Sequence, residues 1–174
     1  MNYGEIKKND IADGEGVRTS LFVSGCRHHC KNCFNPQTWD FGFGEPFTEA
    51  TMLEILNSCE PEWINGLTLL GGEPFEPENQ RVLLPFLIMF KEKYPDKDIW
   101  CYSGFTLEEI LGKWDSRAYT DISAEMLSLI DVLVDGRFID AQKNITLKFR
   151  GSANQRVIDV KKTLAENKVV LYLE

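Results

Sequence analysis

Short apolar runs that are followed by glycine recur along the chain and constrain its fold more than any other feature. Each run is rich in β-branched or aromatic side chains and predicts a buried strand, while several of the segments between them have the apolar spacing of helices. Strands that alternate with helices indicate βα units and a parallel sheet, so the predicted class is α/β. The predicted strands are residues 19–24, 67–70, 99–102, 132–134, 157–160 and 169–173, and the predicted helices are residues 48–58, 78–94, 107–114 and 123–130.

The length of the chain limits how many βα units it can hold. A closed eight-unit barrel needs at least about 200 residues, whereas this chain has 174. With room for about five or six strands, the sequence favours a partial βα barrel that is open along one side, although an open doubly wound sheet fits the pattern equally well. Because 43% of the residues are hydrophobic, we expect one core and a single domain over residues 1–174.

Three of the five cysteines, Cys26, Cys30 and Cys33, lie within eight residues directly after the first predicted strand. Such crowding does not suit a secreted disulfide framework and indicates a metal site in a reducing compartment. Three thiolates from one loop can ligate three irons of a [4Fe-4S] cluster and leave the fourth iron open to a small molecule. The alternatives are a structural zinc site that adds His28 or His29, and three unliganded cysteines.

The other two cysteines, Cys59 and Cys101, have no cysteine neighbour at motif spacing. We interpret both as structural, because a free cysteine mostly behaves as a small buried hydrophobe. His28 and His29 are the only histidines, which excludes a histidine-based metal triad and a distant Cys/His catalytic pair.

The charge of the chain bears on its partners and compartment. Nineteen basic and twenty-seven acidic residues give a net charge of −8, the wrong sign for a nucleic-acid partner. Residues 1–18 lack the apolar region of a signal peptide, and the longest apolar stretch, residues 82–90, is too short to span a bilayer. We therefore expect a cytoplasmic protein without a nucleic-acid or membrane partner.

Glycine motifs at the ends of the later strands predict a binding rim. In Gly71-Gly72-Glu73-Pro74, the glycines let the backbone approach a ligand, and Glu73 or strand-edge carbonyls can accept hydrogen bonds from an ammonium group. Ser103 follows the third strand, and Asp135 and Arg137 follow the fourth, where the arginine is suited to bind a carboxylate. Each motif alone also fits a simple turn or an exposed ion pair.

The cysteine spacing in a loop after the first strand of a short βα chain resembles the radical S-adenosylmethionine superfamily. More narrowly, the chain is similar to the activating proteins of anaerobic (class III) ribonucleotide reductases, from about Asp13 to Arg156. Asn32 departs from the superfamily, which often has an aromatic residue before the third cysteine. The similar segments are residues 13–18, 33–35, 38–39, 71–74, 102–105, 131–138 and 150–156.

The resemblance implies a [4Fe-4S] cluster on Cys26, Cys30 and Cys33, with no catalytic residue beyond the cluster. It further implies that S-adenosylmethionine is cleaved reductively and that the resulting radical removes a hydrogen from a glycine of the large reductase subunit. An electron donor such as flavodoxin would then be a partner. The implied cofactor-binding residues are Asn32, Cys33, Phe34, Gly71, Gly72, Glu73, Pro74, Ser103, Asp135 and Arg137.

Other readings of the same residues stay open at this point. The cysteine spacing also fits an activase for a different glycyl-radical protein, or a small-molecule radical enzyme such as a deazaguanine synthase. A zinc-binding or electron-transfer module would bind metal without cleaving S-adenosylmethionine. Residues 150–156 fit cofactor binding, partner docking or capping of the last strand equally well.

Overall fold

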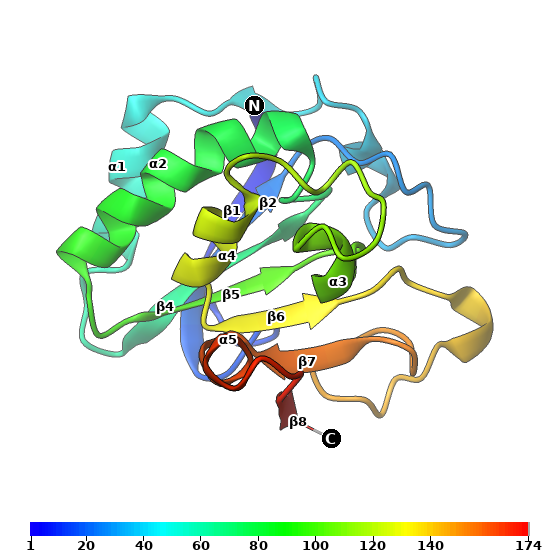
Figure 1. Cartoon of the computed structure of the whole chain (residues 1–174). Helices are drawn as coiled ribbons and strands as arrows, with labels where there is room; N and C mark the ends of the chain where they lie inside the picture. The colour runs from blue at the N-terminus through cyan, green and yellow to red at the C-terminus, as the bar shows by residue number, and fades with distance from the viewer. Residues whose placement is uncertain (174) are drawn as a thin grey trace.

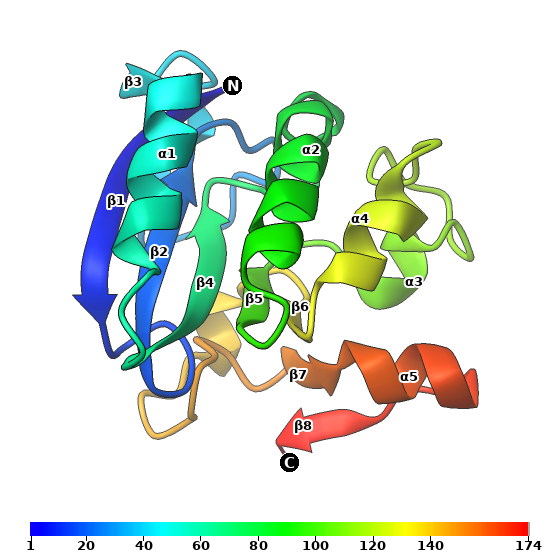
Figure 2. The same ribbon diagram turned by 90° about the vertical axis from the view of Figure 1, so that its left-hand side faces the viewer.

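The computed structural model describes residues 1–173 and shows one mixed sheet with its longer helices on one face (Figures 1 and 2). The order in the sheet is β3-β1-β2-β4-β5-β6-β7-β8, and the two end strands do not pair with each other. The central strands β2, β4, β5 and β6 are parallel, and the outer strands pair antiparallel. The strands are β1 (Asn2–Asp10), β2 (Val17–Val23), β3 (Glu45–Pro46), β4 (Ile64–Gly71), β5 (Asp98–Tyr102), β6 (Val132–Asp135), β7 (Arg156–Asp159) and β8 (Leu171–Leu173).

The helices connect the parallel strands and cover one face of the sheet, as Figure 2 shows for α1, α2 and α4. Thr48 is the N-cap of α1, because its side chain accepts a hydrogen bond from the Thr51 amide. Pro85 lies inside α2, which nevertheless continues over 17 residues. The helices are α1 (Glu49–Ser58), α2 (Pro77–Lys93), α3 (Leu107–Ile110), α4 (Ser123–Leu129) and α5 (Val160–Glu166), with short 3-10 helices η1 (Pro36–Trp39) and η2 (Asp140–Gln142).

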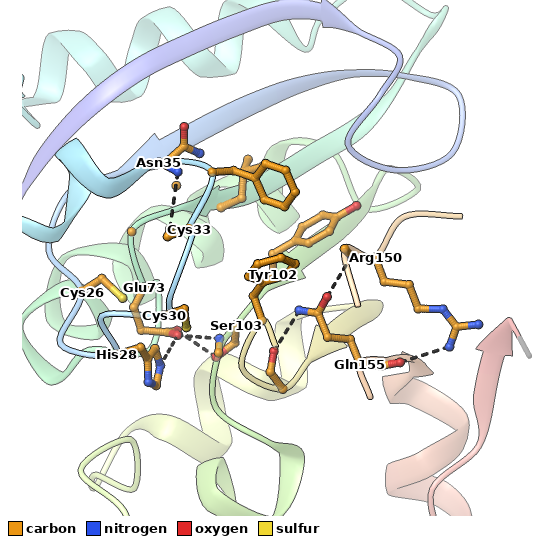
Figure 3. A pocket seen from close by; sticks show the side chains of 18 of the residues that line it. Cys26, His28, Cys30, Cys33, Asn35, Glu73, Tyr102, Ser103, Arg150 and Gln155 are labelled. Atoms are coloured by element: carbon orange, nitrogen blue, oxygen red, sulfur yellow. Dashed lines mark hydrogen bonds and ion pairs between the residues drawn. The ribbon is translucent and has the colours of Figure 1, made fainter. Parts of the chain in front are cut away.

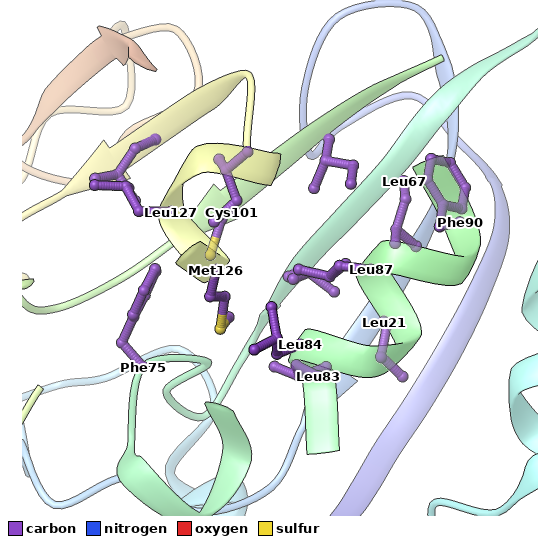
Figure 4. Close-up of a cluster of buried hydrophobic side chains, with 14 of the residues drawn as sticks. Leu21, Leu67, Phe75, Leu83, Leu84, Leu87, Phe90, Cys101, Met126 and Leu127 are labelled. Atoms are coloured by element: carbon purple, nitrogen blue, oxygen red, sulfur yellow. The ribbon is translucent and has the colours of Figure 1, made fainter. Parts of the chain in front are cut away.

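Successive side chains of the central strands point to opposite faces of the sheet, one covered by the helices and one not. Leu21 and Cys101 point to the helices, where they are fully buried in the main core with α2 residues such as Leu87 (Figure 4). Their neighbours Phe22 and Tyr102 point to the opposite side of the sheet. That second face has a smaller apolar cluster around Trp100 and is the side on which the cavity described below lies.

The six strands expected from the sequence are all present, with shifted ends, but two strands and one helix were missed. β1 alternates exposed charged residues such as Glu5 with half-buried ones such as Ile6, so it has no apolar run to reveal it. Val160, expected in a strand, begins α5 instead. β7 pairs antiparallel with β6, which differs from the fully parallel sheet expected, because no crossover helix separates these two strands.

Among residues 1–173, none of the helices combines the length and the apolar character that a bilayer crossing requires.

Candidate metal centre

A cavity of about 410 Å³ opens where the parallel strands end, on the face of the sheet opposite the main core. Its walls come from the loops after β2, β4, β5 and β6 and from the loop that precedes β7. Cys26, Cys30 and Cys33 all line it, with Arg150 and Gln155 across from them (Figure 3). The cavity therefore brings together the cysteine loop and the glycine-marked strand ends.

Gly25 sets the direction in which the cysteine loop leaves β2. Its φ is +100°, and a Cβ there would lie 2.3 Å from the ring of Phe41, so only glycine fits. The loop is then held by backbone hydrogen bonds from Gly25 to the Thr38 carbonyl (2.8 Å) and from Cys26 to the Trp39 carbonyl (3.2 Å). The first thiol is thus placed by backbone contacts with η1.

The two histidines, which the sequence offered as possible zinc ligands, both contact groups other than the thiols. The His28 Nε2 atom lies 2.9 Å from the buried Glu73 carboxylate, and the His29 ring packs on Trp39 with ring centroids 4.5 Å apart. Both rings therefore have partners other than the thiols, which disfavours a Cys₃His zinc site. Within residues 1–173, no three His, Cys, Asp or Glu side chains converge on the position of a single metal ion.

The chemistry of the donor set fits a cubane cluster, because three thiols line one cavity and a cluster spreads its ligands over separate irons. Burial, with smaller contributions from the charges of Glu73 and other neighbours, raises the pKa of Cys26 to about 12. Burial likewise raises the pKa of Cys30. The Cys26 and Cys30 thiols are therefore protonated near neutral pH in the metal-free protein, and metal binding at these two residues must release their protons.

The Gly71-Gly72-Glu73 turn brings the end of β4 against the start of the cysteine loop. Gly71 has a φ of +107°, and a Cβ on Gly72 would lie 2.6 Å from the Gly25 carbonyl oxygen. The Glu73 amide donates to that same carbonyl at 2.9 Å. Both glycines are required because two backbones meet here without room for a side chain.

The carboxylate of Glu73 is fully buried and holds several segments together. Its Oε1 accepts from the Phe75 amide (2.9 Å) and the Ser103 hydroxyl (2.8 Å), and its Oε2 from the Gly104 amide (2.7 Å) and His28 (2.9 Å). The dashed lines in Figure 3 mark the contacts with His28 and Ser103. With four donors in place, this carboxylate is saturated, and the strand-edge carbonyls are the other acceptors that the sequence offered for an ammonium group.

The structure brings six of the implied cofactor-binding residues to the cavity and leaves four outside its lining. Asn32 instead donates to Asp140 at 2.9 Å, which ties the cysteine loop to η2. The six that line the cavity are Cys33, Phe34, Gly71, Gly72, Glu73 and Ser103, and the four that do not are Asn32, Pro74, Asp135 and Arg137.

The charged side chains of the Asp135-Gly136-Arg137 motif at the end of β6 are paired with other protein groups. Asp135 is 1% exposed and accepts hydrogen bonds from Arg156 at 2.9 Å and from the Leu107 amide at 2.8 Å. Arg137 pairs with Glu109 at 3.0 Å. Of this motif only Gly136 lines the cavity.

The sequence did not single out the residues on the β-sheet side of the cavity as part of a site. Phe22, Leu70 and Tyr102 line it, and the alternation along β2, β4 and β5 could have shown that they share a face. Arg150 and Gln155 also line it, which places the ambiguous segment 150–156 partly at the cavity. In the sequence, the only indication of a role for these two residues is that the segment 150–156 is rich in hydrogen-bonding groups.

Asp13, which lines the cavity, forms a pair with Asp10 that the sequence did not single out as a site. Burial, together with a hydrogen bond to Asp10, raises the pKa of Asp13, which lines the cavity, to about 7. Burial opposes ionisation of Asp10 as well, but hydrogen bonds from Asp13, Lys7 and Ser20 outweigh it and lower the pKa of Asp10. The pair therefore holds one proton over much of the acidic range, on the Asp13 side.

Comparison with known proteins agrees with a cluster-binding cavity. The family model of the 4Fe-4S single cluster domain matches residues 12–158. The chain is 44% identical over 157 residues to an anaerobic ribonucleoside-triphosphate reductase-activating protein of Pasteurella multocida, covering 89% of this chain and 95% of the relative. Proteins of the same name from Escherichia coli (strain K12) and Enterobacteria phage T4 are 38% and 37% identical over 159 residues, covering 90% of this chain and 97% and 93% of those proteins.

Proposed function

The chain belongs to the family of anaerobic ribonucleoside-triphosphate reductase-activating proteins, and from this premise we propose that it is a radical S-adenosylmethionine enzyme that forms a glycyl radical on the reductase. The observation that carries the proposal is the convergence of Cys26, Cys30 and Cys33 on one cavity with the end of β4. These thiols would hold three irons of a [4Fe-4S] cluster and leave one iron free for the cofactor.

When bound, the cluster supplies one electron for the cleavage of S-adenosylmethionine, and the radical produced removes a hydrogen atom from a glycine of the partner. The residues of the chain bind and orient the groups involved. The turn at Gly71 and Gly72 would offer backbone acceptors to the methionine amino group, and the backbone of residues 32–34 is the proposed contact of the adenine. Phe22, Leu70 and Phe149 give the cavity apolar walls that exclude water.

Arg137 is the proposed partner of the cofactor carboxylate, and Asp135 and Pro74 stay proposed cofactor contacts although none of the three lines the cavity. In the structure the Arg137 guanidinium pairs with Glu109 at 3.0 Å. Binding a carboxylate would therefore require Arg137 to leave or share this partner. Its side chain is 44% exposed, so the exchange costs little in lost burial.

We also propose that the sheet acts as a partial βα barrel open along one side. The two end strands do not pair with each other, so a loop of another protein has room to reach the cavity. This arrangement suits a macromolecular substrate, namely the large subunit of the anaerobic reductase. A flavodoxin-type protein in the cytoplasm is the proposed electron donor.

The proposal is tested by anaerobic reconstitution with iron and sulfide. We expect about four irons per chain, release of methionine and 5′-deoxyadenosine under a strong reductant, and a glycyl radical signal in electron paramagnetic resonance after the large reductase subunit is added. Cys30→Ala is the negative control. Stoichiometric zinc without cleavage, or cleavage without a radical on the reductase, would contradict the proposal.

A further inference from the structure

His28 lies between two of the cysteines, and its side chain is almost completely enclosed. The side chain is 3% exposed, and its ring packs edge-on against Phe105 with centroids 4.3 Å apart. A Cβ on Gly104 would lie 2.5 Å from the imidazole ring, so the glycine after Ser103 makes room for it. This histidine is therefore fixed against the end of β5, although it belongs to the loop that follows β2.

The hydrogen bonds at Glu73 assign the direction of the bond from His28. The Phe75 and Gly104 amides can only donate, and the Ser103 hydroxyl already accepts from the Phe105 amide at 3.0 Å and so donates to Glu73. The two carboxylate oxygens accept from all three of these groups, and the same pattern assigns Nε2–H of His28 as the fourth donor. Removing that donor would leave a fully buried carboxylate short of a partner.

A second buried carboxylate holds the residue before His28. Glu76 is fully buried and accepts from the Arg27 amide at 2.8 Å and from the Arg27 guanidinium at 2.7 Å. Arg117 also contacts Glu76 at 3.0 Å. The segment from Glu73 to Glu76 thus holds two successive residues of the cysteine loop, His28 through its side chain and Arg27 through both its backbone and its side chain.

We propose that His28 is a positioning residue, which fixes the loop between Cys26 and Cys30 through its hydrogen bond to Glu73 so that both thiols face the cavity. The inference rests on the proposed cluster. It deepens that proposal by assigning a role to a histidine that is not a metal ligand. Partners that orient the ligands of a metal site change metal affinity by about 10–100-fold when they are removed.

The test compares loop variants of the reconstituted protein. His28→Phe keeps the ring against Phe105 but removes the donor, whereas His28→Gln keeps an N–H group near the position of Nε2. His29→Phe is the matched control, since the His29 ring packs on Trp39 and a phenyl ring can keep that contact. His28→Leu is a second variant without a donor in case the Phe variant does not fold, with folding checked by circular dichroism.

The measured quantities are the rate of cluster loss to an iron chelator under anaerobic conditions and the paramagnetic resonance spectrum of the reduced cluster. We expect the variant without a donor to lose its cluster about tenfold faster and to give a broadened spectrum. His28→Gln and His29→Phe should stay within about twofold of the parent in rate, with the parent spectrum.

Equal rates and spectra in His28→Phe and the parent would overturn the inference, as would a failure of His28→Gln to restore them. These measurements need no reductase. A parent protein that holds its cluster but forms no glycyl radical would therefore contradict the proposed function while this comparison still decides the role of His28. A parent that binds zinc instead of iron would overturn both.

Discussion

The five cysteines fall into two groups with different surroundings. Cys26, Cys30 and Cys33 line the cavity, whereas Cys59 and Cys101 are fully buried in the main core. We expect alanine at any of the first three to abolish cluster binding and S-adenosylmethionine cleavage. Alanine at Cys59 or Cys101 should keep both and lower the free energy of unfolding by about 1–2 kcal/mol. Iron content, product release and denaturant titration measure these effects, and loss of cleavage in Cys101→Ala with an intact cluster would contradict the assignment.

Asp13 links the pH to the stability of the fold. Its pKa is about 7 in the folded protein against 3.8 for the free side chain, so the folded state holds an extra proton between these values. Stability from Asp13 is therefore fully present below the lower value and is lost as the pH rises through about 7. We expect Asp13→Asn to remove this fall in the free energy of unfolding between about pH 5 and pH 8. Denaturant titration at both pH values measures it, and parallel curves for parent and variant would refute it.

The proposed metal ligands could be singled out in the sequence because they are close together in it. Cys26, Cys30 and Cys33 need only a loop and a spacing to be recognised. The role of Glu73 could not be predicted, since its partners His28 and Ser103 are 45 and 30 residues away. A glutamate that binds a ligand and one that holds three chain segments together look the same in the sequence.

At the level of elements, the end of β4 has little room for a side chain, because it lies against the backbone of β2. A Cβ on Gly71 would lie 2.7 Å from the backbone of Phe22, at a φ of +107°. We expect Gly71→Ala to lower the free energy of unfolding by roughly 2–3 kcal/mol and to reduce iron loading. Gly42→Ala is the control, because the Cβ there would meet only the Asp40 carboxylate at 3.4 Å. Equal stability of the two variants would refute the prediction.

The central strands were predictable because their residues are buried on both faces of the sheet. β4 presents a run of five buried residues over residues 66–70, and β6 is buried throughout. β1 and β3 lie at the edge of the sheet and are polar, so their pairing depends on contacts with β2 and with each other rather than on local composition. The antiparallel direction of β7 likewise depends on how the loop 136–155 folds back.

At the level of the whole molecule, exposed apolar side chains near the cavity predict where the partner docks. Ile11 is 76% exposed and Ile145 is 91% exposed, each in a loop that contributes other residues to the cavity wall. Such side chains gain most from being covered by another protein. We expect hydrogen exchange in the presence of the reductase subunit to slow in residues 11–16 and 138–151. Residues 61–63, in the loop that enters β4, serve as the control, and protection there instead would contradict this orientation.

The contacts that hold the cysteine loop are contributed by segments spread along nearly the whole chain, from Gly25 through Glu73 and Ser103 to Gly151, against which Phe34 packs. During synthesis on a ribosome, the three thiols emerge long before the carboxylate and the loops that enclose them. Iron delivered to the nascent chain would meet an unstructured peptide. If the three thiols hold the proposed cluster, we therefore expect its insertion to follow translation, into a chain that has already folded.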